Sequence, residues 1–153
     1  MLNGQKVIAL CVNIEFMNKN GEILIIEDDE DDREYIESVF TELQYENPRV
    51  FVNDANAALD YIRQHDKHPF MIISDINMPG MNGFDLRNII FSDLQLNEKC
   101  IPYIFLSTSD DADLVKKAFK LSVQGYFKKP NEYSELKSVI KQIMEYWIKS
   151  CTP

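Results

Sequence analysis

The sequence predicts an α/β fold with a parallel five-stranded sheet and helices on both of its faces. Short apolar runs alternate about five times with longer segments whose apolar residues recur at helical spacing. Ile23–Ile26 is apolar throughout, as expected for a strand that is buried on both faces. This alternation is typical of sheets in which each helix connects two parallel strands.

The first two strand–helix units justify this assignment in turn. A helical stripe of apolar residues over 35–43 follows the first strand. The second strand, Arg49–Val52, begins directly after Pro48. Asp54 is placed to cap the next helix, whose apolar residues fall within 58–62.

The last three units follow the same order. They consist of strands over 70–74, 103–106 and 125–128, followed by helices with apolar stripes within 84–90, 114–119 and 133–147, respectively. Pro79-Gly80 and Gly83 break the chain before the third helix. Asp110 or Asp111 is placed to cap the fourth helix.

The chain has the size and composition of one globular domain, with 153 residues of which 45% are hydrophobic. We expect residues 21–150 to form this domain, residues 1–20 an N-terminal extension of uncertain role and residues 151–153 a tail. The apolar run 7–12 is far shorter than the roughly 20 residues that span a bilayer, and no signal-peptide cleavage site follows it. These features favour a cytoplasmic protein.

The charge balance and the possible metal-binding side chains argue against several classes of protein. Sixteen Lys and Arg residues against 25 Asp and Glu residues give a formal net charge of −9, which disfavours nucleic acid and anionic membranes as partners. Cys11, Cys100 and Cys151 are too far apart to suggest a disulfide framework or a zinc site. His65 and His68 have no further metal ligand nearby in the sequence, so we interpret them as a solvated helix end.

Polar residues follow the predicted strands at their carboxyl ends, where open parallel sheets bind ligands. They are Glu27 and Asp28 after the first strand, Asp75 and Asn77 after the third, Ser107 after the fourth and Lys129 after the fifth. Crowded carboxylates require a cation, and oxygen ligands of this kind suit Mg²⁺. We interpret the further acids 29–32 as the solvated first turn of a helix, where carboxylates favour the helix dipole. The ammonium of Lys129, held by the proline that follows it, can balance Asp75.

At these positions the sequence resembles the CheY-like receiver domain of two-component response regulators, over about residues 21–150. The motifs that carry the resemblance are Ile25-Ile26-Glu27-Asp28, Ser74-Asp75-Ile76-Asn77-Met78-Pro79-Gly80-Met81-Asn82-Gly83, Leu106-Ser107-Thr108 and Gly125-Tyr126-Phe127-Lys128-Lys129-Pro130. The resemblance implies a flavodoxin-like, doubly wound (βα)5 fold with strand order 2-1-3-4-5. Within the family, the segment 106–109 and the pair Tyr146-Trp147 resemble stand-alone regulators that are paired with phytochrome-like histidine kinases.

The resemblance implies a phosphoacceptor and a metal site. Asp75 would accept a phosphoryl group from a sensor histidine kinase or a phosphotransfer protein. Asp28, Asp75 and the backbone carbonyl of Asn77 would ligate Mg²⁺, and Glu27 would act through a water molecule. Asp29 is the fallback ligand, because it follows Asp28 directly. The chain would then be a phosphorylated signalling protein of the bacterial cytoplasm rather than an enzyme, apart from slow self-phosphorylation and self-dephosphorylation.

The resemblance also implies a conformational readout of phosphorylation. Lys129 and the hydroxyl group of Ser107 would contact the phosphoryl group, and Tyr126 would be the aromatic switch residue whose rotamer reports the change. The sequence departs from the family at Thr108, where a small residue is usual. A β-branched side chain there could narrow the access to Asp75, which bears on the lifetime of the phosphorylated state.

Three other functions compete with this interpretation. A phosphatase of the haloacid-dehalogenase type needs an aspartate two residues after its nucleophile, where this chain has Asn77. A flavin carrier would need a Ser/Thr/Gly loop after the first strand, where this chain is acidic. A docking module with an idle phosphorylation site fits the same motifs.

The last helix suggests a homodimer. Residues 143–148 are apolar on more than one side, although a helix on the outside of a sheet needs only one apolar stripe. We expect self-association through the fourth helix, fifth strand and fifth helix of the repeating pattern. Phosphorylation of Asp75 would shift the dimer equilibrium through Ser107 and Tyr126.

Overall fold

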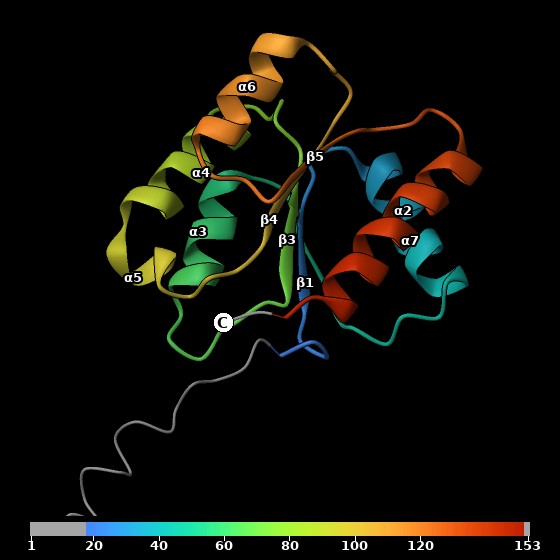
Figure 1. Cartoon of the computed structure of the whole chain (residues 1–153), viewed down its shortest axis with the longest axis horizontal. Coiled ribbons are helices and arrows are strands. Elements are labelled where there is room, and N and C mark those ends of the chain that lie inside the picture. Colours follow the sequence, from blue (N-terminus) through green and yellow to red (C-terminus); the bar gives the residue numbers. More distant parts are fainter. Residues whose placement is uncertain (1–17, 152–153) are drawn as a thin grey trace, which may run out of the picture.

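A parallel five-stranded sheet lies between two layers of helices in the computed structural model, which describes residues 18–151 (Figure 1). The strands are β1 (Ile23–Ile26), β2 (Arg49–Val52), β3 (Met71–Ser74), β4 (Tyr103–Ser107) and β5 (Gly125–Lys128). Their order is β2-β1-β3-β4-β5, and every neighbouring pair is parallel. The predicted fold class and strand order are therefore confirmed. Most of the expected N-terminal extension, including Cys11, lies outside the described residues.

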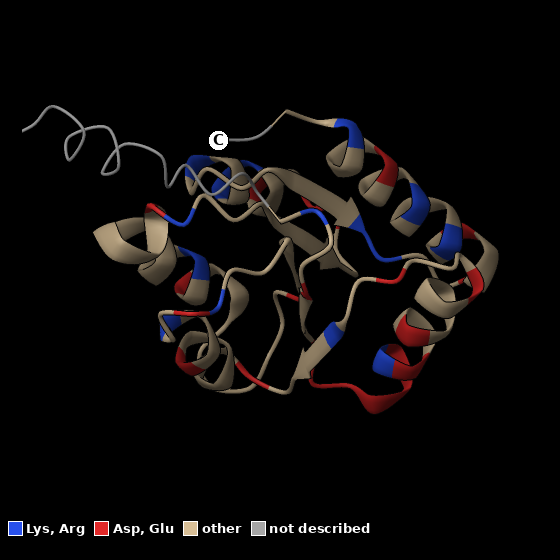
Figure 2. Cartoon of the chain, turned by 90° about the horizontal axis from the view of Figure 1, so that it is seen from below, with Lys and Arg blue, Asp and Glu red and all other residues tan. Residues whose placement is uncertain are grey.

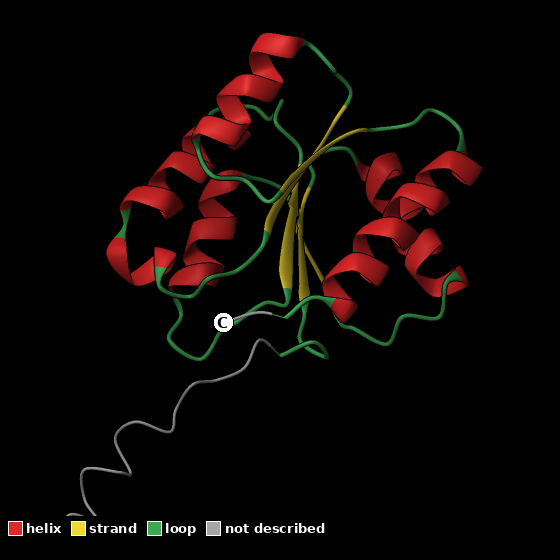
Figure 3. Cartoon of the chain, viewed as in Figure 1, coloured by secondary structure: helices red, strands yellow, loops and turns green. Residues whose placement is uncertain are grey.

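The helices cover both faces of the sheet (Figure 3). They are α2 (Glu30–Glu42), α3 (Ala55–Arg63), α4 (Gly83–Ser92), α5 (Leu94–Asn97), α6 (Ala112–Lys120) and α7 (Tyr133–Lys149). In Figure 1, α2 and α7 lie on one side of the sheet and the other helices lie on the opposite side. Within residues 18–151, no helix is long and apolar enough to cross a membrane.

Two separate hydrophobic cores explain why the central strand β1 is apolar at every position. Successive side chains of a strand point to opposite faces. Leu24 and Ile26 accordingly pack in the core under α3, α4 and α6, whereas Ile23 and Ile25 pack in the core under α2 and α7. All four side chains are at most 1% exposed. A polar residue anywhere in β1 would therefore leave one core incomplete.

Asp and Asn side chains begin four of the longer helices. Asp29, Asp54, Asn82 and Asp111 each accept a hydrogen bond from a backbone N–H group in the first turn, which satisfies a donor that has no partner within the helix. Asp111, rather than Asp110, is the cap of α6. The caps fix the direction in which the chain leaves the sheet edge.

Basic side chains from distant segments close three helix C-termini. Lys99 donates to the carbonyls of Ile62, Gln64 and Lys67 at the end of α3, at 2.6–2.9 Å. Lys19 and Arg87 do the same for the ends of α7 and α6, respectively. A cation at a helix C-terminus both satisfies free carbonyls and opposes the helix dipole. These contacts connect neighbouring segments at the amino ends of the strands, which is the edge of the sheet opposite the polar residues.

The structure differs from the predicted elements in small ways. The short helix α5 was not predicted; its four residues are too few to show a helical stripe, and Asp93 caps it with hydrogen bonds to two backbone N–H groups. The third strand begins one residue later than predicted, at Met71, and the fourth ends one residue later, at Ser107. The extension of β4 draws Ser107 into the sheet, where its side chain is fully buried.

Candidate functional site

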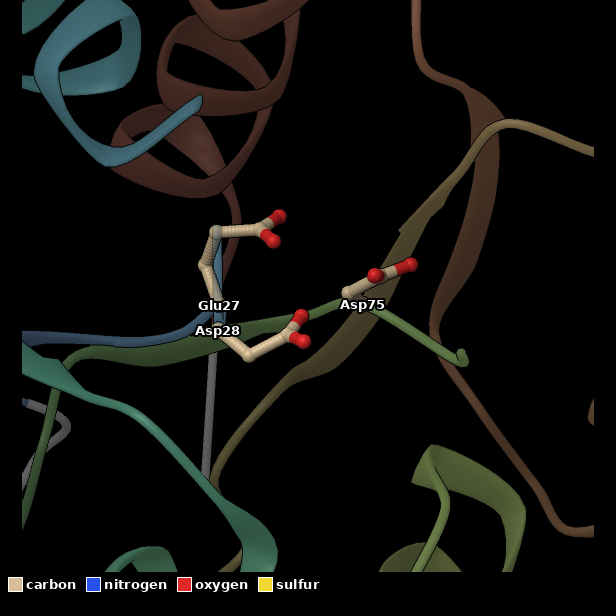
Figure 4. A group of neighbouring side chains, drawn as sticks. All are labelled: Glu27, Asp28 and Asp75. Carbon is tan, nitrogen blue, oxygen red and sulfur yellow. The ribbon is translucent and has the colours of Figure 1, made fainter. Parts of the chain in front are cut away.

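Three carboxylates meet at the carboxyl ends of the two central strands. Glu27 and Asp28 follow β1, and Asp75 follows β3 (Figure 4). One oxygen from each side chain lies within 4.8 Å of the other two. Figure 2 shows acidic positions gathered in this region, at the start of α2. Like charges this close repel one another unless a cation or a proton intervenes.

Parallel pairing continues for one residue past the strands and fixes the backbone of this site. The Glu27 N–H group donates to the carbonyl of Val52 at 3.1 Å, and the Asp75 N–H group donates to the carbonyl of Ile26 at 3.0 Å. Both acids are thus held by the sheet rather than by a free loop. A rigid backbone of this kind limits how far apart the two carboxylates can move.

Asp75 is half-buried, and its carboxylate interacts mainly with backbone groups. Its Oδ1 atom accepts a hydrogen bond from the N–H group of Ile76 at 2.7 Å. Burial raises the pKa of Asp75, and the repulsion from Asp28 adds to this effect, whereas the charge of Lys129 and the N–H groups of Ile76 and Asn77 oppose it. The net shift is upward, so the ionised carboxylate is under electrostatic strain that a cation would relieve.

Lys129 forms the most buried ion pair of the site. Its Nζ atom lies 2.6 Å from Oε2 of Glu27, and the two side chains are 9% and 3% exposed. Burial still raises the pKa of Glu27, despite this hydrogen bond. For Lys129, burial alone would lower the pKa, but the hydrogen bonds with Asp32 and Glu27 outweigh burial and raise it. The lysine therefore remains a cation at neutral pH.

Asp32 also belongs to the site, although its position in the first turn of α2 predicted only an interaction with the helix dipole. Its Oδ2 atom accepts a hydrogen bond from Lys129 Nζ at 2.8 Å. By contrast, Asp29 caps α2 and bonds the backbone N–H group of Asp32 at 3.0 Å. The contact between Asp32 and Lys129 joins residues 97 positions apart, so helical spacing could not reveal it.

Ser107 and Tyr126 lie on the side of the site formed by β4 and β5. The carbonyl of Ser107 accepts a hydrogen bond from the Lys129 N–H group at 2.6 Å. The Tyr126 hydroxyl group donates to the carbonyl of Ser109 at 2.7 Å, and its ring packs edge-to-face on Phe105. The last residue of β4 thus contacts Lys129, and the loop that follows contacts Tyr126.

The remaining candidate residues are placed as follows. Asn77 is exposed in the loop after β3, and Thr108 is exposed in the loop after β4. Thr108 lines a small cavity of about 160 Å³ together with Asp32 and Lys129. His65 and His68 are exposed in the turn after α3 and do not belong to the carboxylate group.

The donor set of the site fits a hard divalent cation. Three carboxylates can each supply an oxygen atom around one point, and Mg²⁺ binds through few protein oxygens while it keeps several waters. The neighbouring ammonium of Lys129 leaves the cluster with a net negative charge, which favours a cation further. The same edge of the sheet thus brings together a half-buried carboxylate, oxygen atoms that could hold a metal ion, an ammonium group and a buried serine.

Comparisons with known proteins agree on the kind of domain that carries this arrangement. A family model described as a response regulator receiver domain matches residues 23–141. The chemotaxis protein CheY-3 of Vibrio cholerae is 30% identical over 129 residues, which cover 84% of this chain and 95% of that protein.

Solved structures give the same result. The phosphorylated cyanobacterial phytochrome response regulator RcpA superposes with a TM-score of 0.77 at 30% identity, over 86% of this chain and 96% of that one. The Mn²⁺-bound form of the response regulator Rcp1 gives a TM-score of 0.74 at 25% identity, over 85% of this chain and 96% of that one.

Proposed function

The chain belongs to the response regulator receiver domain family, and on that premise we propose that Asp75 is its phosphoacceptor. Membership makes the chain a response regulator of two-component signalling rather than a classical enzyme. The observation that carries the assignment of Asp75 is its position at the end of β3, with Glu27 and Asp28 on the neighbouring strand. Its partner is a sensor histidine kinase or a phosphotransfer protein.

The transfer joins a carboxylate oxygen of Asp75 to the phosphorus of a phosphohistidine. As the new P–O bond forms, the P–N bond breaks and its electron pair returns to the imidazole of the donor. The product is an aspartyl phosphate. Charge on the transferred group is spread over three equatorial oxygens, so positioning and nearby positive charge supply most of the catalysis.

The residues around Asp75 fit these needs. Asp28, Asp75 and the backbone carbonyl of Asn77 would hold Mg²⁺, with Glu27 acting through water. A bound Mg²⁺ supplies positive charge to the phosphoryl oxygens. Lys129 contacts the same oxygens from the side of β5, and Ser107 donates its hydroxyl group to them. Support for a divalent metal comes from the carboxylate group itself and from the Mn²⁺-bound relative Rcp1.

We further propose that phosphorylation is read out by protein–protein contact or phosphorelay. Tyr126 would change its packing when Ser107 moves toward the phosphoryl group. Self-association through α6, β5 and α7 is one such readout, because Phe119 and Tyr146 are 55% and 65% exposed on these helices. The phosphohistidine donor is itself made from ATP, which is a cytoplasmic nucleotide, so the proposed function implies that the chain acts in the cytoplasm.

The alternatives have less support. A haloacid-dehalogenase-type phosphatase needs a carboxylate at position 77, where Asn77 has an amide. The match to the receiver family covers most of the chain and does not favour that activity. An idle docking module remains the outcome that the next experiment is designed to detect.

The test is phosphorylation by acetyl phosphate in the presence of Mg²⁺, followed by intact-mass measurement. The wild-type chain should gain one phosphoryl group and Asp75→Asn should gain none. Asp31→Asn, which removes a neighbouring exposed carboxylate, should be modified like the wild type. Modification of Asp75→Asn to the wild-type level would contradict the assignment, and an unmodified wild-type chain would indicate an idle site.

A further inference from the structure

Asp32 occupies a helix position that usually has a different role. It is the third residue of α2, after the cap Asp29. In α4 the equivalent acid, Asp85, bonds back to the N–H group of the cap Asn82 and closes a reciprocal capping box. In α2 the N–H group of the cap bonds to Oε1 of Glu27 instead, at 3.1 Å. The carboxylate of Asp32 is therefore released from capping.

The released carboxylate holds the site lysine. Within residues 18–151, the hydrogen-bond acceptors of Lys129 Nζ are Glu27 at 2.6 Å and Asp32 at 2.8 Å. Asp75 acts on this ammonium through its charge alone, without a hydrogen bond. Lys129 thus lies between the end of β1 and the start of α2 when Asp75 is unmodified.

We propose that Asp32 is a positioning residue that holds Lys129 in this resting place and competes with the phosphoryl group on Asp75 for its ammonium. The inference rests on the proposed function and adds a regulator of the same site. An ammonium has three donors, and two of them are directed here to carboxylates. The third donor makes no hydrogen bond with Asp75, so contact with phosphoryl oxygens on Asp75 would move the Lys129 ammonium toward Asp75 and away from one of these partners.

The exposure of the two partners decides which one Lys129 releases. Glu27 is 3% exposed, so breaking its bond would leave a buried carboxylate without its cation. Asp32 is 35% exposed and can be solvated by water instead. Phosphorylation should thus exchange the Asp32 contact for the phosphoryl contact and leave the Glu27 contact in place. The exchange also frees the first turn of α2 from the β5–α7 loop.

The first test measures the affinity of the Mg²⁺-loaded chain for beryllofluoride, a noncovalent mimic of the phosphoryl group. Asp32→Asn removes the competitor, and Asp31→Asn removes an equal charge from the adjacent exposed position without a contact to Lys129. Asp32→Asn should bind beryllofluoride about fivefold more tightly than Asp31→Asn, a modest factor because Asp32 is partly solvated. Equal affinities of the two variants, or weaker binding by Asp32→Asn, would overturn the competition.

The second test needs neither metal nor mimic. The ammonium protons of Lys129 should be protected from solvent exchange in the wild type, so that the ¹⁵N ammonium signal is observed. This signal should be weaker in Asp32→Asn and should return to its wild-type strength in Asp32→Glu. A signal that is unchanged in Asp32→Asn would show that Asp32 does not position the lysine. A wild-type chain that binds no beryllofluoride overturns the proposed function together with the competition, even if the ammonium signal responds as expected.

Discussion

The Cα atom of Gly83 packs directly against the backbone carbonyl of Asp75. A Cβ atom at position 83 would overlap this carbonyl and would come within 2.9 Å of Ile76 Cα and Phe105. The Gly83 N–H group also donates to the carbonyl of Ile76 at 2.9 Å. The first residue of α4 therefore packs against the backbone of the proposed phosphoacceptor, and only glycine leaves room for this approach.

Gly83→Ala should therefore disturb both stability and phosphorylation. Overpacking against fixed backbone atoms costs about 1–3 kcal/mol of unfolding free energy, and each kcal/mol lowers Tm by about 2–4 °C in a chain of this size. Thermal unfolding and the rate of acetyl-phosphate modification measure the two effects. Ser92→Ala, at the exposed end of the same helix, is the control. A Gly83→Ala variant as stable and as reactive as that control would show that the loop can move aside.

The adjacent acids Asp28 and Asp29 should differ in their effect on metal binding. Asp28 faces Glu27 and Asp75 in the carboxylate group, whereas Asp29 is occupied with capping α2. Asp28→Ala should weaken Mg²⁺ binding by at least about tenfold, because even the loss of a residue that only orients a metal ligand costs about that much affinity. Asp29→Ala should mainly lower the stability of α2, by about 1 kcal/mol. Titration of Mg²⁺ into each variant, alongside thermal unfolding, separates the outcomes; a larger loss of affinity for Asp29→Ala would reverse the assignment.

Much of this arrangement could be predicted from the sequence because it depends on local patterns. A strand between two cores has to be apolar throughout, as Ile23–Ile26 is, and parallel strands bring their carboxyl ends to one edge. The residues that follow those strands could therefore be named before the structure. The cap of α3 is likewise a local feature, and Asp54 could be named for it from the sequence.

The features that were not predicted depend on contacts across the fold. Arg87 lies on α4 in a helical pattern, where a charged residue is expected to face solvent, yet it is 5% exposed and bonds the carbonyls at the end of α6. Asp32 resembles any acid in a first helical turn until Lys129 is placed beside it. In both cases the partner is a backbone carbonyl or a cation far away in sequence, and no local pattern encodes it.

The raised pKa of Asp75 predicts how the metal-free chain responds to pH. A carboxyl group whose folded pKa lies above its ordinary value of 3.8 favours the folded state when protonated, and this contribution is lost as pH rises through the folded pKa. Asp75→Asn stays neutral, so its Tm should exceed that of the wild type by roughly 2 °C near neutral pH. The excess should shrink as pH falls from neutral through the folded pKa toward the ordinary value of 3.8.

Thermal unfolding in the presence of EDTA across this range measures the effect. Addition of Mg²⁺ at neutral pH should then raise the Tm of the wild type more than that of Asp75→Asn, since the ligand carboxylate must be ionised. Asp31→Asn, which changes an exposed carboxylate, should show no excess that depends on pH. An Asp75→Asn variant that is less stable than the wild type at every pH would refute the burial argument.

The geometry of α7 divides its exposed apolar residues between two sides. Tyr133 and Lys137 contact Glu42 of α2, and Ile148 lies about three helical turns beyond Lys137 on the same side. Tyr146 lies on a different flank, away from α2, with its ring edge-to-face on Trp147 at 5.1 Å. Of the two exposed residues at this end of α7, only Tyr146 is therefore placed to join Phe119 of α6 in a dimer interface.

Self-association should consequently depend on Phe119 and Tyr146 but not on Ile148. Beryllofluoride with Mg²⁺ should increase the dimer fraction, because a ligand shifts an equilibrium toward the state that binds it better. Tyr146→Ser should weaken the dimer by about tenfold, since exposed aromatic residues supply much of the binding energy of interfaces. Ile148→Ser removes a comparable apolar side chain on the side of α2 and should leave the dimer intact. Sedimentation equilibrium of the three chains, with and without beryllofluoride, decides between these outcomes; a wild-type monomer at high concentration in both states would eliminate the dimer.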